Sequence, residues 1–81
     1  MTGHAGEIEE TCLRIYRDAM GVPELAATDE FVHAGGDSVK AVLIATQLET
    51  AFGIEIPMAT FFEKKTVADM SDWLAAAAAR S

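Results

Sequence analysis

The sequence predicts an all-α fold, a small four-helix bundle with three main helices and one short one. Apolar residues recur at spacings of three and four in the segments 7–20 and 66–79, as expected for helices with one buried face. A third segment, 38–52, contains neither glycine nor proline. No stretch predicts a strand. The 81 residues are expected to form one domain, residues 1–81, near the lower size limit for a self-sufficient core.

The first helix is expected to run from Glu7 to Met20. Acidic residues crowd its start and arginines lie near its end, which favours the helix dipole. Gly21 and Pro23 follow in the usual order for a helix end. The apolar stripe of this helix consists of Ile8, Cys12, Ile15, Tyr16 and Ala19.

A long connection then covers residues 22–37. Connections of this length inside compact domains are usually functional or disordered. This one carries four apolar residues that are expected to hold it against the core: Val22, Leu25, Phe31 and Val32. The connection is therefore a candidate functional segment.

The second helix is expected to run from Ser38 to Phe52 and to end at Gly53. Pro57 suits the first turn of a short third helix, which covers residues 58–63.

A fourth helix is expected at residues 66–79. Thr66 can cap it, and Asp69, three residues further on, resembles the acidic half of a capping box. Its expected buried face consists of Val67, Met70, Trp73, Leu74 and Ala77.

Charge and composition narrow the possible partners. The formal net charge of −7 disfavours nucleic acids and anionic membranes and favours basic protein surfaces. No run of apolar residues is long enough to span a membrane, and the N-terminus does not resemble a signal peptide. With a single cysteine, Cys12, the expected compartment is the cytoplasm, and the thiol is expected to be a small buried apolar group.

The segment Gly35-Gly36-Asp37-Ser38 is the most informative part of the sequence. If Asp37 is the N-cap, Ser38 occupies the first helical position and its hydroxyl is free. The two glycines permit positive φ angles and keep side chains away from an approaching molecule. A serine at the positive end of a helix is well placed to carry a phosphate ester. The alternative is an ordinary glycine turn before an ordinary helix.

Catalysis by Ser38 is disfavoured, because a nucleophilic serine needs a base and an orienting acid. The two histidines are His4, near the N-terminus, and His33, in the connection. The segment 28–37 also lacks the alternating oxygen ligands of a calcium loop, so no metal site is predicted.

Three stretches together resemble a known family. They are Phe31-Val32-His33-Ala34-Gly35-Gly36-Asp37-Ser38-Val39, Ala51-Phe52-Gly53-Ile54-Glu55-Ile56-Pro57, and Phe61-Phe62-Glu63 with Thr66-Val67. They resemble phosphopantetheine-dependent carrier proteins, and within these the peptidyl and aryl carriers of nonribosomal peptide synthesis. The resemblance covers about Phe31 to Leu74. The lysines before Thr66 depart from the family pattern, in which a proline often precedes that threonine.

The resemblance implies a non-catalytic carrier. A separate phosphopantetheinyl transferase would attach 4′-phosphopantetheine to Ser38, with Gly35, Gly36 and Asp37 as the supporting loop. The arm would hold an aminoacyl, aryl or peptidyl group as a thioester. Adenylating or acylating enzymes would load it, and condensation or tailoring enzymes would use it. A monomer is expected.

Two alternatives stay open at this point: an acyl carrier of polyketide or fatty-acid type, and a helical interaction adaptor without a cofactor. The positions of the two ends lead us to expect a free-standing protein rather than an excised domain.

The second helix also predicts a docking surface. If Ala41, Ile44, Ala45 and Leu48 face the core, an apolar stripe starts directly after Ser38 on the outer face. The expected docking residues are Val39, Leu43, Thr46, Met58 and Phe62. The alternative is a helix rotated by one residue, with Leu43 partly buried.

Overall fold

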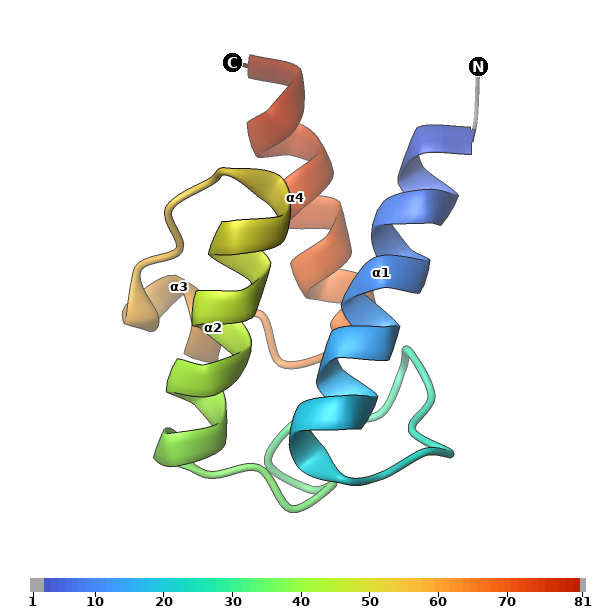
Figure 1. The fold of residues 1–81 in the computed structure, drawn as a ribbon, viewed down its shortest axis with the longest axis vertical. Coiled ribbons are helices and arrows are strands. Elements are labelled where there is room, and N and C mark those ends of the chain that lie inside the picture. Colours follow the sequence, from blue (N-terminus) through green and yellow to red (C-terminus); the bar gives the residue numbers. More distant parts are fainter. Residues whose placement is uncertain (1–2, 81) are drawn as a thin grey trace.

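The computed structural model describes residues 3–80, with side-chain surroundings from Gly6 onward. Four α-helices follow one another: α1 (Gly3–Met20), α2 (Ser38–Phe52), α3 (Met58–Glu63) and α4 (Val67–Arg80) (Figure 1). Within this part of the chain the only β-type pairing is an isolated bridge between Glu30 and Thr66. The prediction of an all-α fold with three main helices and one short one is confirmed.

The bounds of α1 and α4 differ from those expected, and α4 ends at Arg80 instead of Ala79. α1 begins at Gly3 instead of Glu7, so that His4 belongs to the helix. Gly6 is tolerated there, because one glycine costs a helix only about 1 kcal/mol. α4 begins at Val67, because Thr66 lies outside it as the capping residue and its hydroxyl accepts a hydrogen bond of 3.0 Å from the Asp69 amide.

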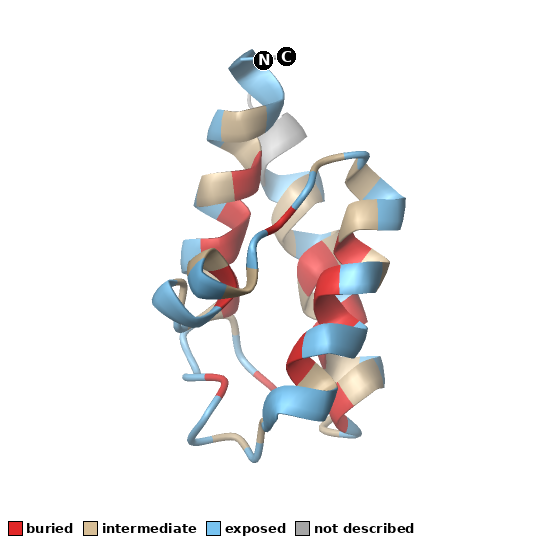
Figure 2. Ribbon diagram, turned by 90° about the vertical axis from the view of Figure 1, so that its left-hand side faces the viewer, coloured by how far each residue is buried: buried red, intermediate tan, exposed pale blue. Residues whose placement is uncertain are grey.

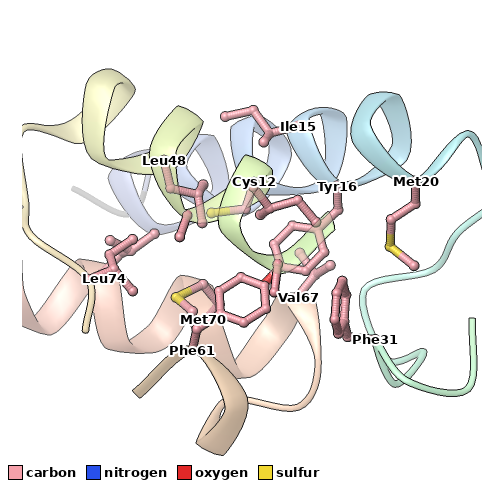
Figure 3. Close-up of a cluster of buried hydrophobic side chains, with 14 of the residues drawn as sticks. Cys12, Ile15, Tyr16, Met20, Phe31, Leu48, Phe61, Val67, Met70 and Leu74 are labelled. Carbon is pink, nitrogen blue, oxygen red and sulfur yellow. The ribbon is translucent and has the colours of Figure 1, made fainter. Parts of the chain in front are cut away.

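The core lies where α1, α2 and α4 meet, and α1 packs most extensively against α4. Buried residues line the inner faces of these helices and exposed residues turn outward (Figure 2). Figure 3 shows the centre of the cluster, where Tyr16 stacks on Phe61 with ring centroids 6.0 Å apart. Trp73 and Ala77, expected in the core, are only partly buried, because the buried face of α4 is centred on Val67, Met70, Ser71 and Leu74 and helical spacing places the other two at its edge.

The connection between α1 and α2 is fixed to the rest of the bundle. Arg17 Nε donates to the carbonyl of Leu25 at 2.9 Å, and the Phe31 amide donates to the carbonyl of Lys65 at 2.8 Å. Leu25 and Phe31 are buried as expected, but Val32 is 66% exposed. The expectation that Val32 anchors the loop is wrong, because its neighbour Phe31 takes the inward position.

The start of α1 and the end of α4 lie at one end of the bundle, and the start of α2 lies at the other (Figure 1). The connection between α1 and α2 passes along this second end of the bundle and leads to Ser38 (Figure 1). In the described residues, no helix has the length and apolar character needed to cross a membrane.

Candidate cofactor-attachment site

Ser38 is the first residue of α2, and Asp37 is its N-cap. The backbone of Asp37 is extended, and its Oδ1 accepts a hydrogen bond of 2.9 Å from the Lys40 amide. The carbonyl of Asp37 accepts the next bond, from the Ala41 amide, also at 2.9 Å. The local geometry expected from the sequence is confirmed: Asp37 makes the capping bonds, and Ser38 is not needed for them.

The Ser38 hydroxyl is open to solvent. The residue is exposed, and within residues 3–80 its side chain makes no hydrogen bond. The amides of Ser38 and Val39 precede the helical ladder and have no acceptor in the described chain. Two free N–H donors at the positive end of a 15-residue helix suit a phosphate group. The residues present therefore fit a phosphate-linked arm.

The two glycines before Asp37 have different roles. Gly35 has φ +100°, in the region that favours glycine, and the space beside its α-carbon is open. Gly36 has no positive φ, but a β-carbon there would overlap the ring of Phe31. The prediction that the two glycines serve to allow positive φ angles is thus right for Gly35 and wrong for Gly36. At Gly36 a side chain is excluded because the buried Phe31 ring lies against the α-carbon.

Phe31 joins the attachment loop to the aromatic core. Its carbonyl accepts a hydrogen bond of 2.9 Å from the Gly36 amide. Its ring meets Phe61 edge-to-face at a centroid distance of 5.2 Å and Tyr16 at 6.3 Å (Figure 3). The backbone before Ser38 is therefore positioned by buried rings from α1 and α3.

Lys40 is a site residue that the sequence reasoning missed. Besides the bond from its amide to Asp37, its Nζ donates to the carbonyl of Gly35 at 3.3 Å. The side chain thus closes the glycine loop from the helix side. A lysine three residues after an N-cap aspartate is the only signal in the sequence that pointed to this contact.

The outer face of α2 is apolar, as expected. Val39 is 76% exposed and Leu43 45%, while Thr46 is also exposed. The alternative of a helix rotated by one residue, with Leu43 partly buried, is wrong, because Leu43 counts among the exposed residues and the expected core residues are the buried ones: Ala41, Ile44, Ala45 and Leu48. Val42, which was not predicted, adds to this face at 53% exposure. On α3, Phe62 is exposed and Met58 is half-buried.

The titratable side chains in the core, Cys12 and Tyr16, are not arranged as catalytic groups around Ser38. Cys12 is fully buried, as predicted, and burial raises the pKa of its thiol; Glu9 adds to the rise and a hydrogen bond with Ser71 opposes it. Burial, with a contribution from Cys12, also raises the pKa of Tyr16. The exposed His33 lies 3.8 Å from Glu30 and makes no hydrogen bond to Ser38. Among the described residues, no cluster of acidic, histidine or cysteine side chains could hold a metal ion.

A bundle of this shape with a free serine at the start of α2 is the architecture of a small carrier domain. Residues 12–74 match the family model described as "Phosphopantetheine attachment site". The chain belongs to this family of phosphopantetheine-dependent carrier proteins, whose cofactor is 4′-phosphopantetheine.

Curated relatives that match the chain are much longer proteins. The chain is 33% identical over 72 residues to surfactin synthase subunit 3 of Bacillus subtilis (strain 168), covering 89% of the chain and 6% of that protein. It is 32% identical over 68 residues to tyrocidine synthase 3 of Brevibacillus parabrevis, covering 84% of the chain and 1% of that protein. The chain thus spans only a few per cent of these relatives.

Solved structures agree with the fold. BlmI, a type-II acyl-carrier-protein from Streptomyces verticillus involved in bleomycin biosynthesis, has a TM-score of 0.86 at 25% identity, covering 90% of this chain and 88% of BlmI. A peptidyl carrier protein in complex with coenzyme A and the phosphopantetheine transferase Sfp has a TM-score of 0.82 at 25% identity. That match covers 85% of this chain and 90% of the other.

Proposed function

We propose that Ser38 is the phosphopantetheine attachment residue, and that this chain carries an aminoacyl, aryl or peptidyl group between the enzymes of a nonribosomal peptide pathway. The observation that supports Ser38 most directly is its exposed hydroxyl, which has no hydrogen-bond partner among the described residues because Asp37 caps α2. Ser38 also lies inside the segment 12–74 that matches the family.

The residues around Ser38 favour attachment for electrostatic reasons. Ser38 Oγ would form a bond to the phosphorus that bears the pantetheine arm as the diphosphate link of coenzyme A breaks. Adenosine 3′,5′-bisphosphate would leave, and the transferase would take up the hydroxyl proton. The free amides of Ser38 and Val39 and the helix dipole stabilise the resulting phosphodiester. The Asp37 carboxylate would oppose it through repulsion, but the Lys40 amide holds Oδ1 toward the helix.

The proposed role of the chain is non-catalytic. The attached arm supplies a thiol that holds the carried group as a thioester. The chain itself presents Ser38 at the end of a rigid helix, with no histidine bonded to the serine in the described residues. Its own thiol, Cys12, is buried in the core and does not compete with the arm (Figure 3).

The proposed partners are a phosphopantetheinyl transferase, an adenylating or acylating enzyme, and condensation or tailoring enzymes. The chain is proposed to act as a monomer in the cytoplasm, where coenzyme A is available. Docking is proposed to use the exposed face formed by Val39, Leu43 and Thr46 of α2 with Met58 and Phe62 of α3. Exposed apolar anchors on a rigid helix are well suited to such transient contacts.

The type of cargo can be tested by loading the holo form. The holo protein, made with coenzyme A and a transferase, is offered an amino acid or aryl acid with ATP and adenylating enzymes, and separately malonyl-coenzyme A with an acyltransferase. We expect a mass increase from an aminoacyl or aryl group that hydroxylamine removes, and none with Ser38→Ala. Loading by the malonyl donor alone would contradict the peptide type.

A further inference from the structure

A groove lies between the attachment loop, α3 and the link that leads to α4. It has a volume of about 270 Å³ and is lined chiefly by Phe31, Val32, Phe61, Phe62, Lys64 and Lys65. The buried rings of Phe31 and Phe61, 5.2 Å apart, form its floor. Phe62, whose ring meets Phe61 at 5.6 Å, is 45% exposed and Val32 is 66% exposed.

The groove has the character of a contact site for a side chain. Large apolar residues exposed side by side mark interaction surfaces. Its volume lies just below the usual range for small-molecule pockets, about 300–1,000 Å³, so it suits one large apolar side chain. The aromatic floor offers edge and face contacts to such an anchor.

The rim of the groove is more basic than the rest of the chain. Only six of the 81 residues are lysine or arginine, and two of these six, Lys64 and Lys65, line the groove. Neither lysine forms an ion pair in the described part of the chain. The groove is also lined by Glu30 and His33, whose side chains lie 3.8 Å apart.

Lys64 also borders a second depression, on whose rim lie Glu63, Asp69 and Asp72. Lys65 lines only the groove, and it is exposed while Lys64 is half-buried. The free positive charge at the groove is therefore carried mainly by Lys65.

The groove lies close to the proposed attachment point. The Phe31 ring on its floor also touches Gly36, two residues before Ser38. An enzyme that works on an arm at Ser38 would therefore also cover the groove, a step that rests on the proposed function.

We propose that the groove receives one apolar side chain of a partner enzyme, flanked on that partner by carboxylates that pair with Lys64 and Lys65. The net charge of −7 predicts partners with basic surfaces. At the groove, however, the lysines make the local charge positive and favour an acidic partner surface. Among the residues that line the groove, two lysines stand against one glutamate, so the local charge is opposite to that of the whole chain.

The test uses a short peptide with one leucine between aspartates, titrated into the ¹⁵N-labelled apo protein. We expect saturable amide shifts confined to residues 30–33 and 61–65, which weaken as salt screens the charges. In Lys64→Glu/Lys65→Glu the apparent dissociation constant should be about threefold or more weaker. Arg14→Glu/Arg80→Glu, which has the same net charge but alters exposed residues of α1 and α4, should bind as the wild type does.

Other results would overturn the proposal. One such result is that the amides of the groove residues do not shift when the peptide is added. Another is that both double variants lose the same amount of affinity for the peptide. A third is that a peptide with lysines in place of the aspartates binds the groove more tightly. If modification of Ser38 alone shifts the same amides, the arm and not a partner fills the groove. Because the peptide binds the apo protein, its failure is distinguishable from failure of Ser38 to accept the arm.

Discussion

Gly36 and Phe31 are in direct steric contact, so that a β-carbon at Gly36 would overlap the Phe31 ring. Phe31 is 4% exposed and is packed against Phe61, which is 1% exposed. The ring is therefore held between Gly36 and the aromatic core. The path of the chain into Ser38 depends on this contact.

Gly36→Ala is expected to displace the loop or the ring, and to lower the free energy of unfolding by about 1–3 kcal/mol. Modification of Ser38 by a phosphopantetheinyl transferase should slow as well, because the loop presents the serine. Adding Phe31→Leu to Gly36→Ala should restore part of both losses by making room. Urea unfolding and the initial rate of modification measure the two effects.

Gly35→Ala provides the matched control. At Gly35 the space is open but φ is +100°, so alanine is strained by its backbone, at a cost of roughly 1 kcal/mol. Phe31→Leu should not relieve this strain. Equal rescue of both alanine variants would show that steric contact is not what makes Gly36 necessary.

Asp37→Ala should lower the free energy of unfolding by about 0.5–2 kcal/mol, because the Lys40 amide loses its acceptor. Asp37→Asn keeps a side-chain oxygen and should retain most of the stability. Urea unfolding at neutral pH distinguishes the two variants. If asparagine costs as much as alanine, the carboxylate charge rather than the capping bond is what stabilises α2.

Leu43→Asp should leave folding nearly unchanged, because Leu43 is 45% exposed, but should weaken loading by a partner enzyme. Leu48→Asp, on the buried face of the same helix, should unfold the protein. Circular dichroism melting and the kcat/KM of loading give both readouts. Normal loading of a folded Leu43→Asp protein would remove Leu43 from the docking surface.

Tyr16→Phe should stabilise the protein by about 1 kcal/mol, because the buried Tyr16 hydroxyl has no hydrogen-bond partner in the described residues. The change should also reduce sensitivity to alkali. Burial raises the pKa of both Tyr16 and Cys12 above their ordinary values of 10.0 and 9.0. Above about pH 9 the unfolded chain loses protons that the native chain keeps, so stability falls as pH rises. Urea unfolding at neutral and alkaline pH should show a shallower decline for Tyr16→Phe, and an equal decline would contradict this assignment.

Local features of the site could be predicted from the sequence because they depend on adjacent residues. Asp37 caps α2 and frees Ser38 through bonds that span only three or four positions. The buried face of α2 follows from helical spacing in the same way.

Contacts across the loop could not be predicted. The choice between Phe31 and Val32 as the inward residue depends on the pairing of the loop with Lys65, which is distant in sequence. Gly36 faces a ring that packs on α3, and the basic groove joins residues 30–33 to 61–65. Spacing along one helix carries no information about such pairings.

The most direct test of the central claim is intact and tandem mass spectrometry after incubation with coenzyme A, magnesium and a broad-specificity phosphopantetheinyl transferase. We expect the mass of one phosphopantetheinyl group to be added and to be located on Ser38, with no gain in Ser38→Ala. An unchanged mass of the folded wild-type protein, or a gain that persists in Ser38→Ala, would contradict the assignment of Ser38 as the attachment point.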